Sequence, residues 1–345
     1  MTTPGGFAVG AAGPRLLAVH AHPDDETLST GALLASWAAS GAPVTVVTCT
    51  RGERGEVIGP ALAHLEGDGP ALAAHRAREL AAALAALGVT DHVWLDTLAT
   101  AAAPDHPAPD HPAPNHPAPD HPAPDHPAGD GRYEDSGMIW WSPGRAGAAP
   151  DSGPAAFARA DLELAARRLG ALLHERRPDV VVTYEPDGGY GHPDHVRAHE
   201  VTMRAVALAS AADPSLAPVV LWAAVDAAAL GRAADELRSA TAGADGMPDG
   251  VRLPGRERTA PSAAVAPDEV ALRVDVLPVL DAVVGALRAH ATQIQAVRTW
   301  ADAAEASVGC LALSDGVLQP LLRHEAYRVA AGDVRRVSWP GAVSG

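Results

Sequence analysis

The sequence predicts an α/β fold, in which a mostly parallel β-sheet is covered by helices on both faces and is followed by a smaller C-terminal α+β part. Short apolar runs rich in valine alternate with stretches of helical length rich in alanine and leucine. The runs are apolar on successive residues, as in strands that are buried on both faces. With 345 residues, the chain is long enough for one large domain with additions or for two modest domains.

The expected elements follow this alternation along the chain. The apolar runs LLAVH at 16–20 and VTVVTC at 44–49 enclose a helical stretch near 27–39, which together indicate a right-handed βαβ unit. Continuation of this pattern makes the expected sheet Rossmann-like. The remaining expected strands lie at 92–95, 179–184, 219–225, 271–276 and 321–330, and the remaining expected helices lie near 70–87, 157–175, 195–210 and 278–296.

Composition divides the chain into four parts. Residues 1–14 are expected to be a flexible N-terminus, and residues 15–230 a Rossmann-like domain that carries the candidate catalytic site. Residues 231–268 are rich in Gly, Pro, Asp and Arg with little periodicity, so we expect an irregular surface excursion. Residues 269–345 are expected to form a C-terminal part that packs on the catalytic domain.

A low-complexity insert interrupts the first domain at 104–128. It repeats the unit Asp/Asn-His-Pro-Ala-Pro and carries five of the sixteen histidines. Proline at two of every five positions removes backbone donors and fixes φ, so an extended, solvated loop is expected. Its histidines suggest a weak metal trap, but the composition favours an insertion without a role of its own.

The charge and the cysteine content indicate which partners and which cellular compartment are expected. The chain has 26 basic and 42 acidic residues, a net charge of −16, and no lysine. This balance argues against a nucleic-acid partner and against binding to an anionic membrane, and it leaves the oligomeric state open. Two cysteines, the absence of a cationic N-terminal leader and the absence of a long apolar segment predict a cytoplasmic protein that is neither exported nor membrane-spanning.

The residues best suited to metal binding or catalysis follow two of the expected strands. His22 and Asp25 come directly after strand 16–20, and a second His-Pro-Asp cluster, with His195, follows strand 179–184. The carboxyl ends of parallel strands meet at one edge of the sheet, where ligands bind. Imidazole and carboxylate are zinc ligands, and a catalytic zinc has three protein ligands and an open position. A His-Pro-Asp triplet alone also occurs in ordinary turns and helix caps, but two clusters after two strands favour a metal site.

Several segments resemble one known family. VHAHPDDETLSTGALLA, VTVVTCTRGERGEVIG, RYEDSGM and RPDVVVTYEPDGGYGHPDHVRAH are similar to the zinc-dependent de-N-acetylases that include the N-acetylglucosaminyl-phosphatidylinositol deacetylase. Within that family the sequence most resembles the mycothiol-pathway branch, which acts on N-acetylglucosaminyl-inositol. The resemblance spans most of residues 15–205, and it continues more loosely through RAHATQI and LRHEAY.

The resemblance implies roles for residues at matching positions. One zinc ion per chain would be bound by His22, Asp25 and His195, and iron(II) also suits such a ligand set. Asp24 would be the general base, and His192 the acid or, in its cationic form, the electrophile that stabilises the oxyanion. Asp194 would orient His192 and raise its pKa, or else cap the helix that follows.

The resemblance also implies substrate-binding positions around the sugar or the inositol. A polyol pocket needs such polar groups, because each buried hydroxyl must be paired. The alternatives are that Arg76 is a solvated residue on a helix face and that Glu56 pairs with Arg54. The implied positions are Ser29, Glu56, Arg76, Asp135 and Tyr190.

Other polar and aromatic residues near these motifs are expected to be supporting. Glu26 is expected to hold a ligand imidazole by its free N–H, with a helix-dipole role as the alternative. His20 is expected to pack at the strand end, and His290 to satisfy polar contacts in the core. Trp140 and Trp141 either line the mouth of the site or pack inside.

The predicted function is zinc-dependent hydrolysis of an acetamide on glucosaminyl-inositol, giving the free amine and acetate. Alternatives in the same family are the mycothiol S-conjugate amidase, which has lysine at the position of Ser29, and a deacetylase of another N-acetylated sugar. Alternatives of a different class are a metal-storage protein that uses the His-rich repeat and a sugar-binding module. The module leaves the two His/Asp clusters unexplained.

Overall fold

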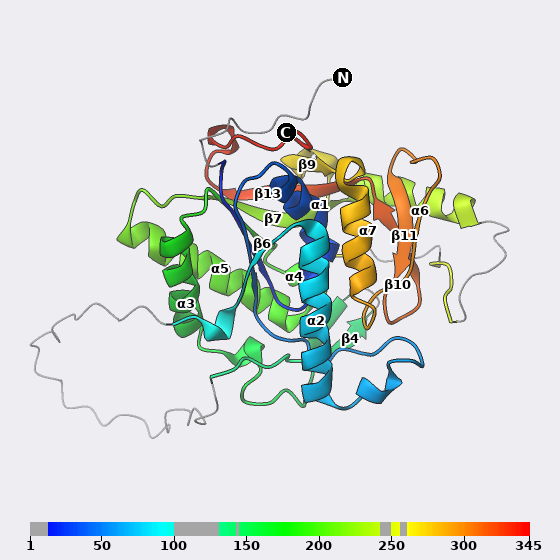
Figure 1. Cartoon of the computed structure of the whole chain (residues 1–345), viewed down its shortest axis with the longest axis horizontal. Coiled ribbons are helices and arrows are strands. Elements are labelled where there is room, and N and C mark those ends of the chain that lie inside the picture. The colour runs from blue at the N-terminus through cyan, green and yellow to red at the C-terminus, as the bar shows by residue number, and fades with distance from the viewer. Residues whose placement is uncertain (1–12, 100–130, 143–144, 242–249, 256–260) are drawn as a thin grey trace, which may run out of the picture.

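The computed structural model describes residues 13–99, 131–142, 145–241, 250–255 and 261–345, and Figure 1 shows their arrangement. A nine-stranded sheet forms the centre of this part of the chain. The predicted extended loop at 104–128 and nearly all of the predicted flexible N-terminus lie outside the described residues.

The central sheet has the order β14-β9-β13-β7-β6-β1-β2-β3, with β8 paired to β7. From β3 through β2, β1 and β6 to β7 all pairings are parallel, which confirms the predicted mostly parallel sheet. Beyond β7 the three C-terminal strands are antiparallel, so residues after 269 extend the same sheet. The strands are β1 (Leu16–His20), β2 (Val44–Thr48), β3 (Asp91–Trp94), β6 (Val180–Tyr184), β7 (Val219–Asp226), β8 (Ala264–Val265), β9 (Leu272–Asp275), β13 (His324–Ala331) and β14 (Val343–Ser344).

Helices cover both faces of this sheet, as predicted. One face carries α1 (Asp25–Ala39), α2 (Gly69–Leu87) and α7 (Leu280–Ala289), and α2 and α7 run side by side in Figure 1. The other face carries α3 (Leu162–Arg176) and α5 (Pro193–Ala212). Alternate residues of β1 enter the two apolar cores, because successive side chains of a strand point to opposite faces. None of the helices in the described part of the chain combines the length and the apolarity that a membrane crossing needs.

Local sequence signals set the limits of α2. The Asp68 side chain accepts a hydrogen bond from the Ala71 N–H at 3.0 Å, and Pro70 occupies the first turn. Gly88 ends the helix with φ 79°, a conformation that costs glycine little. These signals agree with the predicted helix near 70–87.

Two predictions about irregular and helical segments were wrong. Residues 227–241 form a regular helix, α6 (Ala227–Thr241), although we expected an irregular excursion from residue 231. Its buried residues, Ala233 and Leu237, are four positions apart, as on one face of a helix, but the stretch is short and the Gly, Pro, Asp and Arg content of the whole segment 231–268 concealed it. The helix expected near 278–296 ends at Ala289, because residues from Gln295 onward join a separate sheet.

Two small antiparallel sheets accompany the central one, and neither was predicted from the sequence. The first has the order β10-β11-β12 and packs against α6. The second is a hairpin that lies beside the short helix α4, where Gly191 approaches the Ala146 carbonyl too closely for a larger residue. Their bounds are β10 (Gln295–Thr299), β11 (Ser307–Ala312), β12 (Leu318–Leu322), β4 (Met138–Ser142), β5 (Arg145–Ala148) and α4 (Gly188–Gly191).

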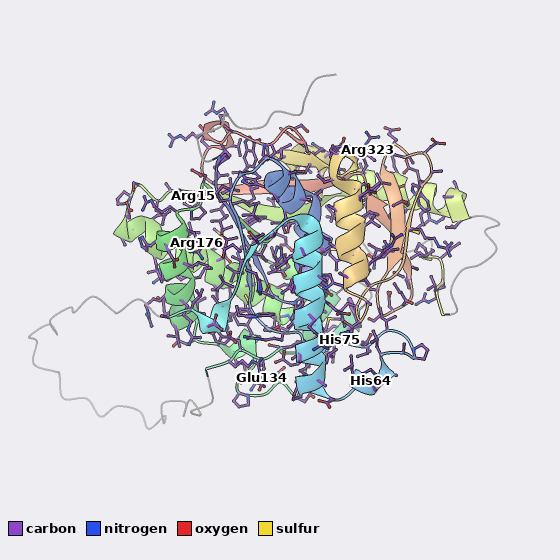
Figure 2. All side chains as sticks on the ribbon, in the orientation of Figure 1. Arg15, His64, His75, Glu134, Arg176 and Arg323 are labelled. Carbon is purple, nitrogen blue, oxygen red and sulfur yellow. The ribbon has the colours of Figure 1, made fainter. Side chains whose placement is uncertain are left out.

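The amino ends of the strands are joined by partly exposed polar contacts. Arg176, at the end of α3, donates to Asp91 of β3 at 2.8 Å, and the Arg15 N–H donates to Asp179 at 2.7 Å; Figure 2 places both arginines on one side of the molecule. An exposed ion pair such as Arg176–Asp91 contributes little to stability, roughly 0–1 kcal/mol. The carboxyl ends of the strands, by contrast, carry buried polar side chains.

Asp96 joins the two chain segments that flank the predicted repeat. Its carboxylate accepts hydrogen bonds from both terminal nitrogens of Arg51 and from the Tyr133 N–H, the latter at 3.2 Å. The Arg51 guanidinium also lies 4.4 Å from the ring of Trp94. Residues 96 and 133 are therefore held together by described contacts, independently of the length of the chain between them.

Glu325 on β13 is a buried carboxylate that binds α1. It accepts the backbone N–H groups of Ala32 at 2.6 Å and Leu33 at 2.9 Å, and the Tyr327 hydroxyl at 2.7 Å. Burial raises the pKa of the Glu325 carboxyl to about 7, although these three hydrogen bonds act in the opposite direction. The contact fixes the antiparallel extension of the sheet to the first helix.

We predict that Glu325 makes the free energy of unfolding depend on pH. Because its pKa is higher in the folded chain than in the unfolded chain, its contribution to stability is full below about pH 4.5 and is lost as the pH rises through about 7. Glu325→Gln removes this titration. The difference in unfolding free energy between the native chain and the variant, measured by urea denaturation, is expected to fall by roughly 3 kcal/mol from pH 4.5 to 7.5. A difference that stays constant over this range would contradict the prediction.

Candidate metal and catalytic site

The three predicted metal ligands converge at the carboxyl ends of β1 and β6. These two strands are parallel neighbours, and the strand order reverses between them, which opens a crevice at their ends. His22 Nδ1 lies 3.2 Å from Asp25 Oδ2, and His195 Nε2 lies 3.3 Å from the same oxygen. All three side chains are buried. His22 and Asp25 thus form one compact cluster with His195, although His195 lies far from them in the sequence.

His195 shows that this cluster suits a cation. Its Nδ1–H donates to the Gly188 carbonyl at 3.1 Å, which leaves Nε2 directed at the Asp25 carboxylate. Nε2 is buried and has no hydrogen-bond partner among the described residues. Two lone pairs at this distance repel each other unless a positive charge lies between them, and a metal ion satisfies both atoms together with His22.

His22 is oriented by a carboxylate on its far side. Its Nε2–H donates to Asp194 Oδ2 at 3.2 Å, which leaves Nδ1 free to face Asp25. Asp194 also accepts the Ser136 N–H at 2.9 Å and the Ser136 hydroxyl. A carboxylate that holds a metal-binding imidazole is a recurring arrangement.

The expected role of Asp194 therefore needs correction. Its side chain contacts His22, and no described hydrogen bond joins it to the His192 ring, although its charge acts to raise the pKa of His192 as expected. It does not cap α5; the cap is the His192 side chain, which accepts the Asp194 N–H at 3.1 Å. Asp194 was expected to contact His192 because the two residues are close in sequence. In the first turn of α5, however, the two side chains have different partners.

His192 lies against the cluster as a neutral imidazole. Its ring is 4.6 Å from the His22 ring and 4.8 Å from the His195 ring. Because Nδ1 accepts a backbone N–H, the proton is on Nε2. Burial holds the pKa of His192 well below its usual value, and His22 and His195 act in the same direction. The cationic form expected from the sequence is thus disfavoured, and His192 presents an N–H donor.

Asp24 lies beside the cluster and contacts Arg76. Its Oδ2 is 3.3 Å from Arg76 Nη2, and its side chain is 14% exposed, so water can reach it. Burial raises the pKa of Asp24 to about 6, Arg76 lowers it and Asp25 raises it further. The Asp25 carboxyl differs: although burial acts to raise its pKa, His195 and His22 hold it well below the usual range. The two adjacent carboxylates have separate environments.

Three of the five predicted substrate positions lie at the cluster. Asp135 Oδ1 is 3.7 Å from His22 Nε2, and the Tyr190 ring is 5.1 Å from the His195 ring. Arg76 is only 3% exposed and donates to the carbonyls of Pro23 and Gly52, so it is not a solvated residue of a helix face.

The other two predicted positions make no contact with the cluster among the described residues. Ser29 lies one helical turn after Asp25 on α1, and its carbonyl accepts the Tyr327 hydroxyl at 3.3 Å. Glu56 is exposed, and its carbonyl accepts a hydrogen bond from Gln293 at 2.8 Å. Arg54 bonds to Asp151 at 2.6 Å rather than to Glu56.

This geometry can be compared with known proteins. Residues 17–206 match the family model described as PIG-L: GlcNAc-PI de-N-acetylase, which covers more than half of the chain. The chain belongs to the GlcNAc-PI de-N-acetylase family. The match includes both His-Pro-Asp clusters and the strands that place them.

Named relatives and a solved structure align over most of the chain. A protein of Kineococcus radiotolerans named 1D-myo-inositol 2-acetamido-2-deoxy-alpha-D-glucopyranoside deacetylase is 43% identical over 92% of this chain and 78% of its own length. A deacetylase of the same name from Saccharopolyspora erythraea is 43% identical over 93% of this chain and 90% of its own. The solved N,N'-diacetylchitobiose deacetylase of Pyrococcus horikoshii is 18% identical, covers 81% of this chain and 70% of its own, and has a TM-score of 0.43.

Two residues that sequence reasoning missed support the ligands. The Tyr184 ring stacks on His195 at 4.2 Å, and its hydroxyl accepts the Ala21 N–H at 2.8 Å. Ser136 fixes Asp194, as described above. Both had a usable signal: Tyr184 is a polar residue at the carboxyl end of an apolar strand, and Ser136 lies in the RYEDSGM motif.

The predicted supporting residues have mixed outcomes. Glu26 holds no ligand imidazole; it accepts the Asp24 N–H at 2.9 Å and the His290 Nε2–H at 2.7 Å. His290 is fully buried in this contact, as expected of a core residue. His20 packs edge-on against Tyr184, approaches Thr30 at 3.0 Å, and has its pKa lowered to about 4 by burial, which confirms the strand-end prediction.

The two tryptophans of the hairpin face the solvent. Trp140 is 57% and Trp141 is 74% exposed, so neither packs inside. Trp140 stacks on Tyr190 with 5.7 Å between the rings, and Tyr190 in turn contacts His195. A continuous aromatic path therefore leads from the surface to the cluster.

We predict that metal affinity depends on His195 directly and on Asp194 indirectly. His195→Ala removes a ligand, and the purified variant is expected to lose the tightly bound ion, measured by elemental analysis after dialysis. Asp194→Asn leaves the ligands in place but weakens the orientation of His22, so affinity is expected to fall about 10-fold to 100-fold in a competition titration. His64→Ala, at an exposed position (Figure 2), is the control and should bind metal like the native chain. Native affinity in His195→Ala would refute the site.

Proposed function

We propose that this chain hydrolyses the acetamide of 1-O-(2-acetamido-2-deoxy-glucopyranosyl)-myo-inositol, giving glucosaminyl-inositol and acetate in mycothiol biosynthesis. The observation that carries the reaction type is the buried His22, Asp25 and His195 cluster, flanked by a carboxylate and an imidazole that are not ligands. The names of the relatives support the substrate, since they align over more than nine tenths of this chain. The proposed reaction type therefore rests on the geometry of the site, and the proposed substrate rests on the names of the relatives.

The metal that we propose is one zinc ion per chain, bound by His22, Asp25 and His195; iron(II) suits the same nitrogen and oxygen donors. The bare Nε2 of His195 supports this choice of ligands. When bound, zinc supplies Lewis-acid polarisation of the acetamide carbonyl and lowers the pKa of coordinated water to about 7.

Asp24 and His192 divide the proton transfers. Asp24 takes a proton from the attacking water as that water adds to the acetamide carbon, and returns it to the amine nitrogen as the C–N bond breaks. His192 donates its Nε2–H to the carbonyl oxygen while negative charge develops there. Arg76, 3.3 Å from Asp24, orients the carboxylate and favours its ionised form.

The remaining surface of the site suits a polyol. Asp135 and Tyr190 place polar groups at the cluster, and we assign Ser29 and Glu56 to more distant substrate contacts, by resemblance to the family. Trp140 adds an exposed aromatic face beside Tyr190, on which the apolar face of a sugar or inositol ring can stack. Cys49 and Cys310 are both free and buried, which supports the proposed cytoplasmic setting.

We predict that the metal-loaded chain releases acetate and free amine from N-acetylglucosaminyl-inositol. Asp24→Asn keeps the ligand set and is expected to lower kcat by about 10²-fold to 10⁴-fold, because general base catalysis is lost. Deletion of residues 104–128 is the matched control, since Asp96 holds the flanking segments together, and it should leave kcat within about 2-fold. Acetate release by coupled assay and amine release by fluorescent labelling provide two readouts.

Other outcomes of this assay would redirect the proposal. Cleavage of a mycothiol S-conjugate without release of acetate from N-acetylglucosaminyl-inositol would assign the chain to the amidase. Several bound zinc ions that disappear with residues 104–128, and no turnover of either substrate, would support the metal-storage alternative.

We predict that Trp140 contributes to substrate binding and not to the chemical step. Trp140→Ala removes the exposed ring beside Tyr190, so KM is expected to rise about 5-fold to 10-fold while kcat changes less than about 2-fold, as for the loss of a stacking contact of roughly 1 kcal/mol. Trp141→Ala is the control, because Trp141 is more exposed and has no ring contact with Tyr190 among those described. Equal changes in both variants would contradict a specific role of Trp140.

A further inference from the structure

The backbone of Asp24 has an unusual conformation. Its φ is 117° and its ψ is −33°, in a region that residues with a side chain rarely adopt. Such a conformation persists only where the surrounding contacts impose it. It also sets the direction of the Cα–Cβ bond, so whatever holds this backbone decides where the Asp24 carboxylate points.

The Asp24 backbone is held from two sides. Its carbonyl accepts the N–H groups of Thr27 at 3.0 Å and Leu28 at 2.9 Å, as the beginning of α1 requires. Its N–H donates to Glu26 Oε2 at 2.9 Å. The carbonyl contacts are available to any residue that precedes a helix, whereas the contact at the N–H depends on one particular side chain.

Glu26 is itself fixed by partners inside the protein. Its side chain is 0% exposed, and its Oε1 accepts the His290 Nε2–H at 2.7 Å and the Thr27 hydroxyl at 2.5 Å. A carboxylate in such a position needs charged or hydrogen-bonding partners to remain there. His290 supplies a hydrogen-bond donor to this carboxylate and is equally buried.

His290 is in turn held by the segment that follows α7. Thr292 donates its N–H at 2.8 Å and its hydroxyl at 2.5 Å to the buried Glu79 of α2. Gln293 donates to the Glu56 carbonyl at 2.8 Å. The C-terminal part of the chain thus places the His290 imidazole in contact with Glu26, in the first turn of α1.

We propose that Glu26, which His290 holds in place, is a positioning residue that keeps Asp24 in its positive-φ conformation and thereby aims the Asp24 carboxylate at the reacting water. The inference rests on the proposed function for the role of Asp24. Arg76 restrains the carboxylate, and Glu26 restrains the backbone, so both ends of Asp24 are fixed. Preorganisation of this kind lowers the barrier, since a small misplacement of a catalytic group costs much of its effect.

Glu26→Gln tests the proposal with little change in volume. The amide has one acceptor oxygen in place of two, so it cannot accept both the Asp24 N–H and the His290 N–H. Crystal structures of the intact chain and of the variant, grown under the same conditions, are expected to show Asp24 with positive φ in the first and negative φ in the second. This readout does not depend on turnover.

Kinetics separate positioning from a general loss of structure. Glu26→Gln is expected to lower kcat about 10-fold to 100-fold, with KM and zinc affinity within about 3-fold of the intact chain. In an Asp24→Asn background, the same change is expected to have less than about 2-fold further effect, because the residue through which Glu26 acts is already disabled. Glu325→Gln, which also removes a buried carboxylate bonded to α1 backbone but not to Asp24, should leave kcat unchanged.

Two results would overturn the proposal: an Asp24 backbone that keeps its positive φ in Glu26→Gln, or equal losses of kcat with and without Asp24. If Glu26→Gln does not fold, His290→Ala takes its place, because it frees Glu26 without altering the first turn of α1, and the same two readouts apply. Absence of turnover by the intact chain would reject the proposed function, whereas the φ of Asp24 in the paired crystals would still decide the inference.

Discussion

The parallel pairing of β1 with β6 is the constraint on which the rest of the site depends. A His-Pro-Asp cluster follows each strand, two residues after β1 and, beyond α4, at the start of α5 after β6. The register that pairs Leu16 with Val180 brings the two carboxyl ends to the same level of the sheet. Because the strand order reverses at this pair, α1 and α5 leave on opposite faces and leave room between their first turns. The ligands are therefore supplied by rigid elements and not by long loops.

Burial of so many ionisable groups in one place needs a compensating network. His22, Asp25 and His195 are surrounded by Asp194, which accepts from His22, by Ser136, which donates to Asp194, and by Tyr184. Tyr184 stacks on His195 and accepts the N–H of Ala21, next to His22. The low polarity around these groups strengthens each contact and makes an unpaired group costly. The orphaned Nε2 of His195 stands out for this reason, and it is the atom that a metal ion satisfies best.

The two adjacent aspartates illustrate how environment separates chemically identical groups. Asp25 faces two imidazoles, which favour its ionised form, whereas Asp24 faces Arg76 and partial solvent and has a pKa near 6. The separation depends on the backbone turn at Asp24, which directs neighbouring side chains to different sides. The proposed ligand Asp25 and the proposed proton acceptor Asp24 can thus follow each other directly in the sequence.

The C-terminal part of the chain belongs to this architecture more closely than its weaker resemblance to the family indicates. Its strands extend the central sheet, Glu325 binds the middle of α1, and His290 reaches the first turn of the same helix. The helix that carries Asp25 is therefore fixed at two levels by residues some 260 to 300 positions later. Contacts to α1 therefore connect the part of the chain after residue 269 with the part before it.

The sequence by itself determined the alternating α/β pattern, the parallel core strands and the candidate ligands His22, Asp25 and His195, because these depend on local periodicity and on motifs placed directly after strands. It did not determine α6, the small sheets or the end of α7, because packing against neighbouring elements decides their extent. Nor did it determine that Asp194 holds His22, that His192 is neutral, or that Glu26 pairs with His290. Those outcomes depend on burial, on side-chain direction and on contacts between residues far apart in the chain, which exist only in the folded protein.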